Sequence, residues 1–213
     1  MKSETLIEQD FLDTITKEEE VFNSDEKTNT ISSINYEYEL SLRRNSIDSE
    51  KEMKKFIKKC EAILRTSPEY SDWLEYIREV LDINYCEITN ESTDEVKCEI
   101  HHHPISLYSW VEAIINRNLA QEKKFCSFDV VTELIEYHYQ MKVPFCSLIK
   151  SLHEKFHNGF LEIPMDIVHG DKKFFIQELG HYIDEDSAGL ILGRMKINKT
   201  NCGWKDFKWI EKA

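Results

Sequence analysis

The amino-acid sequence predicts an α+β protein that is mostly helical and carries a β-hairpin. Apolar residues recur at helical spacing through residues 53–64 and again through 73–81. Residues 83–89 and 96–103 then alternate between apolar and polar side chains around a short polar turn, which is the pattern of two antiparallel strands. Helical spacing returns after Pro104, so we expect the hairpin to lie between helical segments.

Composition excludes several classes of protein. The chain of 213 residues is 41% hydrophobic and 31% charged, which is ordinary for a globular protein in water. No apolar run approaches the roughly 18 residues that cross a bilayer, and the N-terminus lacks the apolar stretch of a secretory signal. The six cysteines form no Cys-x-x-Cys pair. We therefore expect a cytoplasmic protein with reduced thiols and no membrane contact.

The net charge of −13 is concentrated toward the N-terminus. Residues 1–50 hold 13 acidic and 5 basic side chains, whereas residues 151–213 hold 10 and 9. Because residues 1–48 also carry few regularly spaced apolar side chains, we expect an acidic, partly disordered region there. It is either an interaction segment or a solvated tail. Overall acidity argues against broad attraction to nucleic acid, which depends on Lys and Arg.

The last twenty residues are the exception to this acidity. They hold six basic and two acidic side chains, together with Trp204 and Trp209. Aromatic residues among basic ones suit contact with nucleic acid. An ordinary tail whose tryptophans dock on the core is the favoured interpretation.

Spacing and capping residues predict the remaining elements. The helix that begins near Ser49 is expected to end at Ser67-Pro68, and Ser127 is placed to cap a helix whose apolar face includes His138. On that face His138 is expected to be a core histidine with one hydrogen bond. The other expected elements are a helix after Pro104, an extended segment Val143–Ser147, a helix through 148–157 that stops at Gly159, an extended segment 160–168, helical residues 172–183 and a last helix over 187–195.

Five of the eight histidines lie in two clusters, at residues 101–103 and at 153 and 157. Imidazole is the commonest metal ligand and also transfers protons near neutral pH. Because His153 and His157 are four residues apart, they share one face of a helix and could bind one ion together. A histidine of the strand would complete the site. Along the strand, His101 and His103 share one face and His102 lies on the other.

The order of a histidine-bearing strand, a connection, a short strand and a helix with His-x-x-x-His resembles the HNH, or ββα-metal, nuclease family. In that family a His-His pair closes the first strand, often with a proline shortly after. The helix carries a histidine, a glutamate and a second histidine before a small residue and a glycine. The matching residues, within the segment 83–160, are His101-His102, Pro104, His153, Glu154, His157 and Gly159.

The resemblance implies an embellished ββα-metal-like core that binds one divalent ion (zinc, magnesium or manganese) through His101, His153 and His157. His102 would be the general base that activates water against a DNA phosphodiester, and Glu154 would orient a ligand. A composition rich in Lys, Asn, Ile and Glu, together with this type of segment, also resembles proteins of bacteriophages and mobile elements. Such a protein would act in the host cytoplasm.

Charge and apolar spacing divide the chain into the acidic region 1–48 and a helical α+β domain, 49–213, with a helical C-terminal cap. The resemblance places the HNH-like segment 83–160 within this domain. As an endonuclease the protein would have DNA as its partner. The acidic region could bind a host protein.

The chain departs from the HNH pattern in three ways. Pro144 stands where the family has its middle asparagine, the zinc-binding cysteine pairs of many members are absent, and a long connection with two extra helices separates Pro104 from His153. Since His101 and His103 share a strand face, which histidine binds and which deprotonates stays open. The alternative function is therefore a catalytically degenerate HNH-like phage protein that binds or regulates a host protein.

A second alternative is a zinc metalloprotease, because residues 153–157 match the signature H-E-x-x-H. That chemistry would make Glu154 the general base and would need a third ligand downstream, for which His169 and His181 are candidates. Lys155 places a charge inside a motif that normally lies along a buried helix. A pattern with two free positions is a weak signal, so this alternative ranks last.

Overall fold

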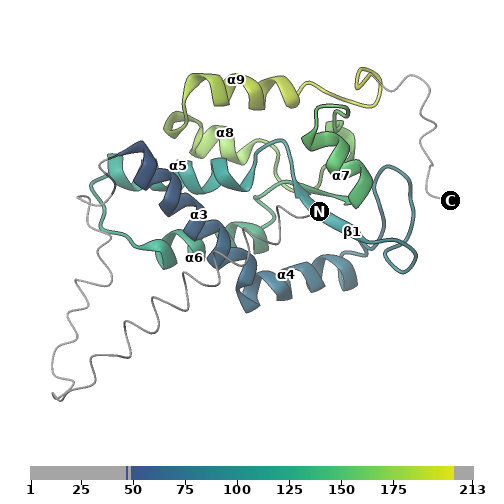
Figure 1. The fold of residues 1–213 in the computed structure, drawn as a ribbon, viewed down its shortest axis with the longest axis horizontal. Coiled ribbons are helices and arrows are strands. Elements are labelled where there is room, and N and C mark those ends of the chain that lie inside the picture. Colours follow the sequence, from purple (N-terminus) through teal and green to yellow (C-terminus); the bar gives the residue numbers. More distant parts are fainter. Residues whose placement is uncertain (1–46, 48, 204–213) are drawn as a thin grey trace, which may run out of the picture. The chain divides into compact units, whose positions relative to one another are not determined.

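The computed structural model describes residue 47 and residues 49–203, all of which belong to one compact unit (Figure 1). The predicted α+β class is confirmed, since these residues combine helices with a two-stranded antiparallel sheet. The acidic region predicted before residue 49 (except residue 47) and the tail after residue 203 lie outside the described residues. The elements are α3 (Glu50–Thr66), α4 (Pro68–Glu79), β1 (Cys98–His102), α5 (Leu107–Ala120), α6 (Ser127–Tyr139), β2 (Phe145–Ile149), α7 (Lys150–His157), η2 (Met165–Ile167), α8 (Phe174–Glu178), η3 (Gly180–Tyr182) and α9 (Glu185–Arg194).

The helices α3 and α4 form where spacing and caps predict them. Ser49 begins α3 with a reciprocal cap, in which its hydroxyl accepts from the Glu52 N–H and the Glu52 carboxylate accepts from the Ser49 N–H. Ser67 caps α4 by accepting from Tyr70 N–H, and Pro68 occupies the first helical position, where no N–H is needed. The predicted break at Ser67-Pro68 is therefore confirmed.

The predicted pairing of the strands is wrong. β1 pairs with β2, antiparallel, from Cys98 opposite Ile149 to His102 opposite Phe145. The expected partner, residues 83–89, forms no strand and instead turns back on itself through an isolated bridge between Tyr85 and Ser92. An alternating pattern predicts which side chains share a face, but it does not specify the partner strand.

Two groups of buried side chains lie around the sheet. On the face of His102 and Phe145 lies the main core, which is built largely by α3, α4, α5 and α6. Its fully buried residues include Trp73 and Trp110, and burying a large apolar side chain contributes about 1.5–3 kcal/mol to stability. On the other face, Leu148 packs in a smaller cluster with Leu152 of α7.

Two helix starts differ from the prediction. Cys126, not Ser127, is the N-cap of α6, because the Asp129 carboxylate accepts from the Cys126 N–H at 2.7 Å. Residues 148 and 149 belong to β2, so α7 begins at Lys150 directly after the strand. A run of apolar residues suits a buried strand as well as a helix, and the sequence did not distinguish them here.

The C-terminal part broadly follows the expected order. Residues 160–164 have no regular secondary structure before the short turn η2, and the helix expected over 172–183 is split into α8 and η3 near Gly180. The last helix, α9, begins two residues earlier than predicted, at Glu185, and ends one residue earlier, at Arg194. Figure 1 shows α9 at the top, above α8, with α7 to its right.

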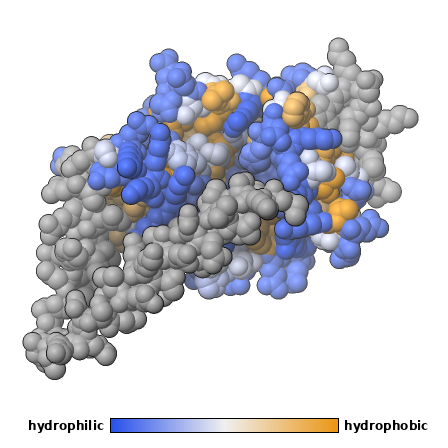
Figure 2. Space-filling view, in the orientation of Figure 1, coloured by the Kyte–Doolittle hydropathy of each residue, from blue (hydrophilic) through white to orange (hydrophobic). Residues whose placement is uncertain are grey.

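The surface of the described residues is mainly hydrophilic in the view of Figure 2, with apolar side chains in small separate groups. The exposed apolar residues include Phe160 after α7 and Leu190 on α9. Among residues 49–203, no helix is both long and apolar enough to cross a membrane.

Candidate metal centre

Strand β1 distributes the three consecutive histidines over its two faces. The rings of His101 and His103 lie 6.0 Å apart between centroids, and both contact the Phe156 ring of α7. The ring of His102 instead lies near Trp73 and His138, on the side of the main core. This is the alternation that a β-strand imposes on successive side chains.

Three histidines converge on the α7 side of the sheet. One ring nitrogen from each of His101, His153 and His157 lies within 4.8 Å of the other two. The ring centroid of His101 is 4.8 Å from that of His153 and 5.3 Å from that of His157. Because α7 starts directly after β2, which is paired with β1, the sheet fixes the helix beside the strand that carries His101.

Glu99 of β1 orients His153. Its carboxylate accepts a hydrogen bond from Nδ1 of His153 at 2.7 Å, and this bond holds the pKa of Glu99 below its usual value. With the proton on Nδ1, the Nε2 atom of His153 presents a lone pair toward His157, whose Nε2 lies 2.9 Å away. A carboxylate behind a histidine is the usual support of a metal-binding imidazole.

The distance between His153 and His157 fits a small ion after a minor adjustment, whereas the His101 nitrogen, within 4.8 Å of the other two, would move closer to the ion. Two nitrogens at 2.0–2.1 Å from a tetrahedral ion are about 3.3 Å apart. The gap between Nε2 of His153 and Nε2 of His157 would therefore open by a few tenths of an ångström. His157 is exposed at the end of α7, so a small rotation of its ring meets little resistance.

The protonation states suit a metal ligand set. Burial, followed by the neighbouring histidines, lowers the pKa of His101 to about 2, and burial also lowers the pKa of His157. Both rings are therefore neutral at pH 7, as ligands must be. The Nε2 atom of His101 is buried and has no hydrogen-bond partner, which is an unusual state for a polar atom unless something binds it.

The ligand atoms of the three histidines favour one of the metals expected from the sequence. Three imidazole nitrogens with an open fourth position are typical of zinc and related transition metals. Magnesium prefers oxygen ligands, and none of the three clustered residues supplies one. The residues present therefore fit zinc better than magnesium.

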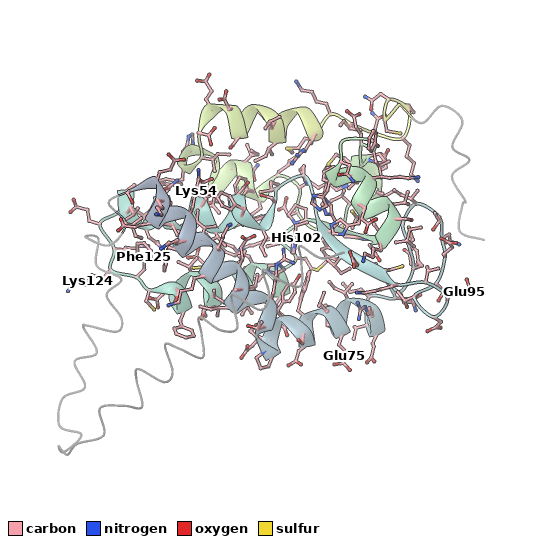
Figure 3. All side chains as sticks on the ribbon, in the orientation of Figure 1. Lys54, Glu75, Glu95, His102, Lys124 and Phe125 are labelled. Atoms are coloured by element: carbon pink, nitrogen blue, oxygen red, sulfur yellow. The ribbon has the colours of Figure 1, made fainter. Side chains whose placement is uncertain are left out.

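His102 lies away from this cluster, so the structure does not support its expected role as general base at the ion. It is buried in the middle of the side chains of the described residues (Figure 3), and its Nε2 lies 3.0 Å from Nε2 of His138. His138 donates from Nδ1 to the Leu134 carbonyl at 2.6 Å, so its Nε2 accepts and His102 donates. The prediction that His138 is a core histidine with a hydrogen bond is confirmed.

Glu154 is also outside the cluster. Its side chain is 62% exposed and pairs with Lys150 one turn earlier on α7, with 3.9 Å between Oε1 and Nζ. The histidine that joins His153 and His157 comes from upstream, on β1, and neither His169 nor His181 belongs to the cluster. His169 bonds to Glu87 instead. This arrangement differs from that of an H-E-x-x-H protease with a downstream third ligand.

Comparison with known proteins adds an independent result. The sequence matches the model of a family described as Bacteriophage G278-like virion protein over residues 1–202. The chain belongs to this family. The phage origin expected from the sequence is thereby confirmed. No curated protein and no solved structure matches the chain.

For this member of the virion protein family, the site region includes three further residues. Glu99 contacts His153, and the sequence did not predict that contact. His103 is almost completely buried beside His101, as strand alternation predicted, and one of its ring nitrogens faces the Ile163 backbone. Arg194 lies over the Phe156 ring, 5.5 Å from its centroid, and no sequence pattern indicated it.

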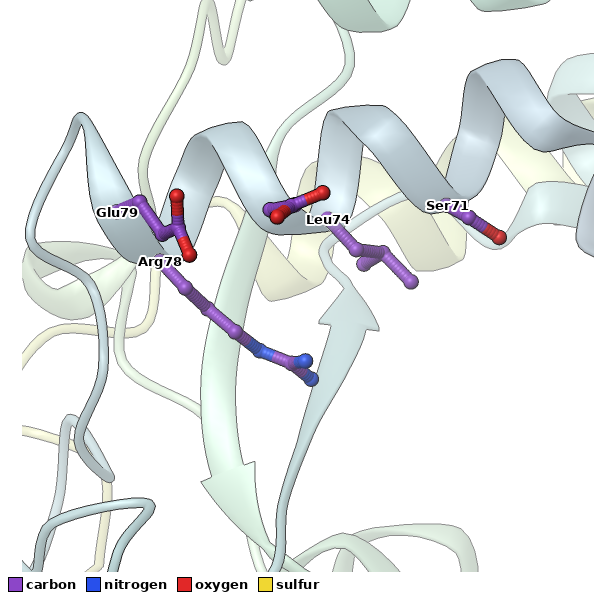
Figure 4. A pocket seen from close by; sticks show the side chains of 5 residues that line it. Ser71, Leu74, Arg78 and Glu79 are labelled. Carbon is purple, nitrogen blue, oxygen red and sulfur yellow. The ribbon is translucent and has the colours of Figure 1, made fainter.

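A surface hollow lies elsewhere, along α4 (Figure 4). It is lined by Ser71, Leu74, Glu75, Arg78 and Glu79. No histidine lines it, and one helix supplies all of its walls. The hollow therefore offers no chemistry comparable to that of the histidine cluster.

Proposed function

We propose that this phage virion protein binds one transition metal ion, most suitably zinc, through His101, His153 and His157. The observation that carries the proposal is the convergence of three imidazole nitrogens on one point, with Glu99 orienting His153. Structural zinc sites commonly join elements that would otherwise be weakly attached. Here the ion would join β1 to α7.

A link of this kind would stabilise α7, which is a short helix. It is eight residues long, and Leu152 is its buried residue. Isolated helices of this length are not stable in water, so α7 depends on tertiary contacts. The ion would hold its last turn, which carries His157, against the strand. In the phage particle this would stabilise a surface through which the protein contacts other virion proteins.

The place where the protein is assembled and its partners are proposed from its family and its free cysteines. Assembly in the reducing cytoplasm of the host agrees with six free cysteines. The acidic region 1–48 is a candidate for contact with another protein, from the virion or from the host. The metal site does not depend on that region.

Metal content tests the proposal. The protein is purified without added metal, and zinc is counted by mass spectrometry in the wild type, His153→Ala and His181→Ala. His181 is an exposed histidine outside the cluster, so its variant is the matched control. We expect about one equivalent of metal in the wild type and the control, and none in His153→Ala. Full metal retention in His153→Ala would rule out this ligand set.

A metal-dependent endonuclease acting on DNA is the second candidate function. The observation in its favour is the chain order β1, β2 and α7, with ligands from the strand and the helix, which resembles the ββα-metal arrangement. The base would then be His103, because its ring lies on the same side of the strand as that of His101. His102 is turned away from that side.

A plasmid-nicking assay distinguishes the two functions. Supercoiled plasmid is incubated with the wild type and His103→Ala in Zn²⁺, Mg²⁺ or Mn²⁺, and with a chelator. The endonuclease predicts nicking by the wild type that is lost in His103→Ala and with chelator. If the protein binds metal but nicks no plasmid in any condition, the ion has a structural role and not a catalytic one.

A further inference from the structure

Arg194, the last residue of α9, brings a positive charge to the proposed metal site. Its Nη1 donates to the Pro104 carbonyl at 3.2 Å, directly after β1 and His103. Its guanidinium carbon lies 5.5 Å from the centre of the Phe156 ring, and that ring is 4.6 Å from the ring of His101. Arg194 is therefore held beside the cluster by two contacts.

The charge of Arg194 acts on the cluster itself. After the larger effect of burial, it contributes to lowering the pKa of His101, His103 and His157. Within the described part of the chain, no carboxylate forms an ion pair with Arg194. The guanidinium is thus a partly buried cation whose acidic partner is missing from residues 49–203.

A bound divalent ion would make this excess of positive charge larger. The ion and Arg194 together carry three positive charges, and Glu99, behind His153, supplies one negative charge. Charges that are partly removed from water are costly unless they are paired. An anion between the ion and Arg194 would offset the excess and would occupy the fourth coordination position.

A second buried imidazole lies on the same side of the strand. The ring of His103 is 6.0 Å from that of His101 between centroids, and one of its nitrogens faces the Ile163 backbone. The surroundings of the proposed ion on this side are therefore polar.

We infer that the metal ion and Arg194 together bind a phosphate group, with one phosphate oxygen on the ion and others on the guanidinium. The inference rests on the proposed metal site and specifies the ligand of its open position. Arg favours phosphate because its planar fork donates two parallel hydrogen bonds to the oxygens of one tetrahedral group. The buried His103 ring beside the cluster keeps this space polar.

Cobalt provides the test, because Co²⁺ replaces zinc at nitrogen sites and its visible spectrum changes with its ligands. The full chain is loaded with Co²⁺ and titrated with inorganic phosphate, dimethyl phosphate or acetate. We expect a saturable spectral change with phosphate, and weaker binding of acetate. A change with dimethyl phosphate would identify a phosphodiester ligand, whereas a change with inorganic phosphate alone would identify free phosphate or a monoester.

Variants separate this inference from the metal site. Arg194→Gln should bind Co²⁺ normally and lose about tenfold or more in phosphate affinity, since a charged hydrogen-bonded pair is removed. Arg194→Lys, which keeps the charge but not the fork, should be intermediate. Lys196→Gln removes an exposed charge two residues away and should behave as the wild type.

Each failure has a distinct meaning. Absence of Co²⁺ binding in the wild type overturns the metal site itself. Normal Co²⁺ binding with no response to phosphate, or equal phosphate affinity in Arg194→Gln and the wild type, overturns the phosphate inference alone. An acetate response as strong as that of phosphate overturns the choice of phosphate as the ligand class.

Discussion

At the scale of single residues, Glu99 decides how His153 can act. A carboxylate can only accept at Nδ1, so the proton stays there and Nε2 is left to bind an ion. His101 needs no such partner, because burial, followed by the neighbouring histidines, lowers its pKa to about 2 and keeps its ring neutral. Glu99 thus fixes which nitrogen of His153 is free, whereas burial fixes the charge of His101.

Replacing Glu99 with glutamine should weaken zinc binding about 10- to 100-fold, the usual cost of losing a carboxylate behind a metal-binding histidine. Zinc affinity is measured by competition with a coloured chelator. Glu154→Gln is the matched control, since this exposed carboxylate on α7 pairs with Lys150. Equal affinity in Glu99→Gln and the control would show that the contact does not support the ligand.

The buried pair of His102 and His138 should make stability depend on pH. Burial lowers the pKa of His138 to about 4, below about 6.5 in the unfolded chain, so the unfolded state takes up the proton first. This contribution to stability is complete above pH 6.5 and is lost as the pH falls toward 4. Between pH 7 and pH 5 the wild type should lose about 2 kcal/mol through His138 alone.

Urea unfolding of the wild type and His138→Met at both pH values measures this contribution. Comparing the pH difference within each protein cancels any constant cost of the substitution. The loss in the free energy of unfolding between pH 7 and pH 5 should be about 2 kcal/mol smaller in His138→Met than in the wild type. The same pH dependence in both proteins would contradict a buried, neutral His138.

At the scale of elements, local signals in the sequence predicted the helices well and the strand pairing poorly. The caps at Ser49 and Ser67 act within three residues, so they can be recognised from the sequence alone. The partner of β1 is β2, more than forty residues away along the chain, and no local pattern encodes that contact. The same limit applies to Arg194, which reaches the site from α9.

The candidate site was predictable in part for the same reason. The spacing of His153 and His157 places them on one helix face, and alternation separates His102 from His101 and His103. The order of residues in the HNH family favoured His102 as the general base. Alternation along the strand instead places His103, and not His102, on the side of the proposed metal site.

Gly170 should matter to the position of β2. Its φ of +84° is unfavourable for other residues, and a Cβ atom there would lie 3.0 Å from the Val143 carbonyl oxygen. Gly170→Ala should therefore cost about 1–3 kcal/mol in the free energy of unfolding. Gly189→Ala, in α9 with open space at the Cβ position, should be neutral or stabilising by up to about 1 kcal/mol. Urea unfolding measures both, and equal stabilities would contradict the strained turn.

At the scale of the whole molecule, the proposed metal site lies where the smaller cluster of buried residues meets the sheet. That cluster holds Leu148, Leu152 and Ile163, and it is separate from the main helical core. A virion protein with its net charge of −13 has little general attraction for DNA. These features favour an ion that stabilises the particle protein over one that serves catalysis.

Zinc should raise the melting temperature of the whole protein. A ligand at 100 times its Kd stabilises the folded state by about 2.7 kcal/mol, which corresponds to about 5–10 °C for a chain of this size. Calorimetry of metal-free protein with and without zinc measures the shift. His153→Ala should show little or none of it. An equal shift in the variant would mean that zinc acts at another place, such as the free cysteines.

X-ray absorption at the zinc edge tests the central claim most directly, because it identifies the atoms bound to the ion. The full-length, zinc-loaded wild type should show three imidazole nitrogens at 2.0–2.1 Å and one further light atom. Loss of the imidazole signal in His153→Ala would agree with the ligand set. Sulfur neighbours at about 2.3 Å would show that cysteines hold the ion, and they would contradict the histidine centre.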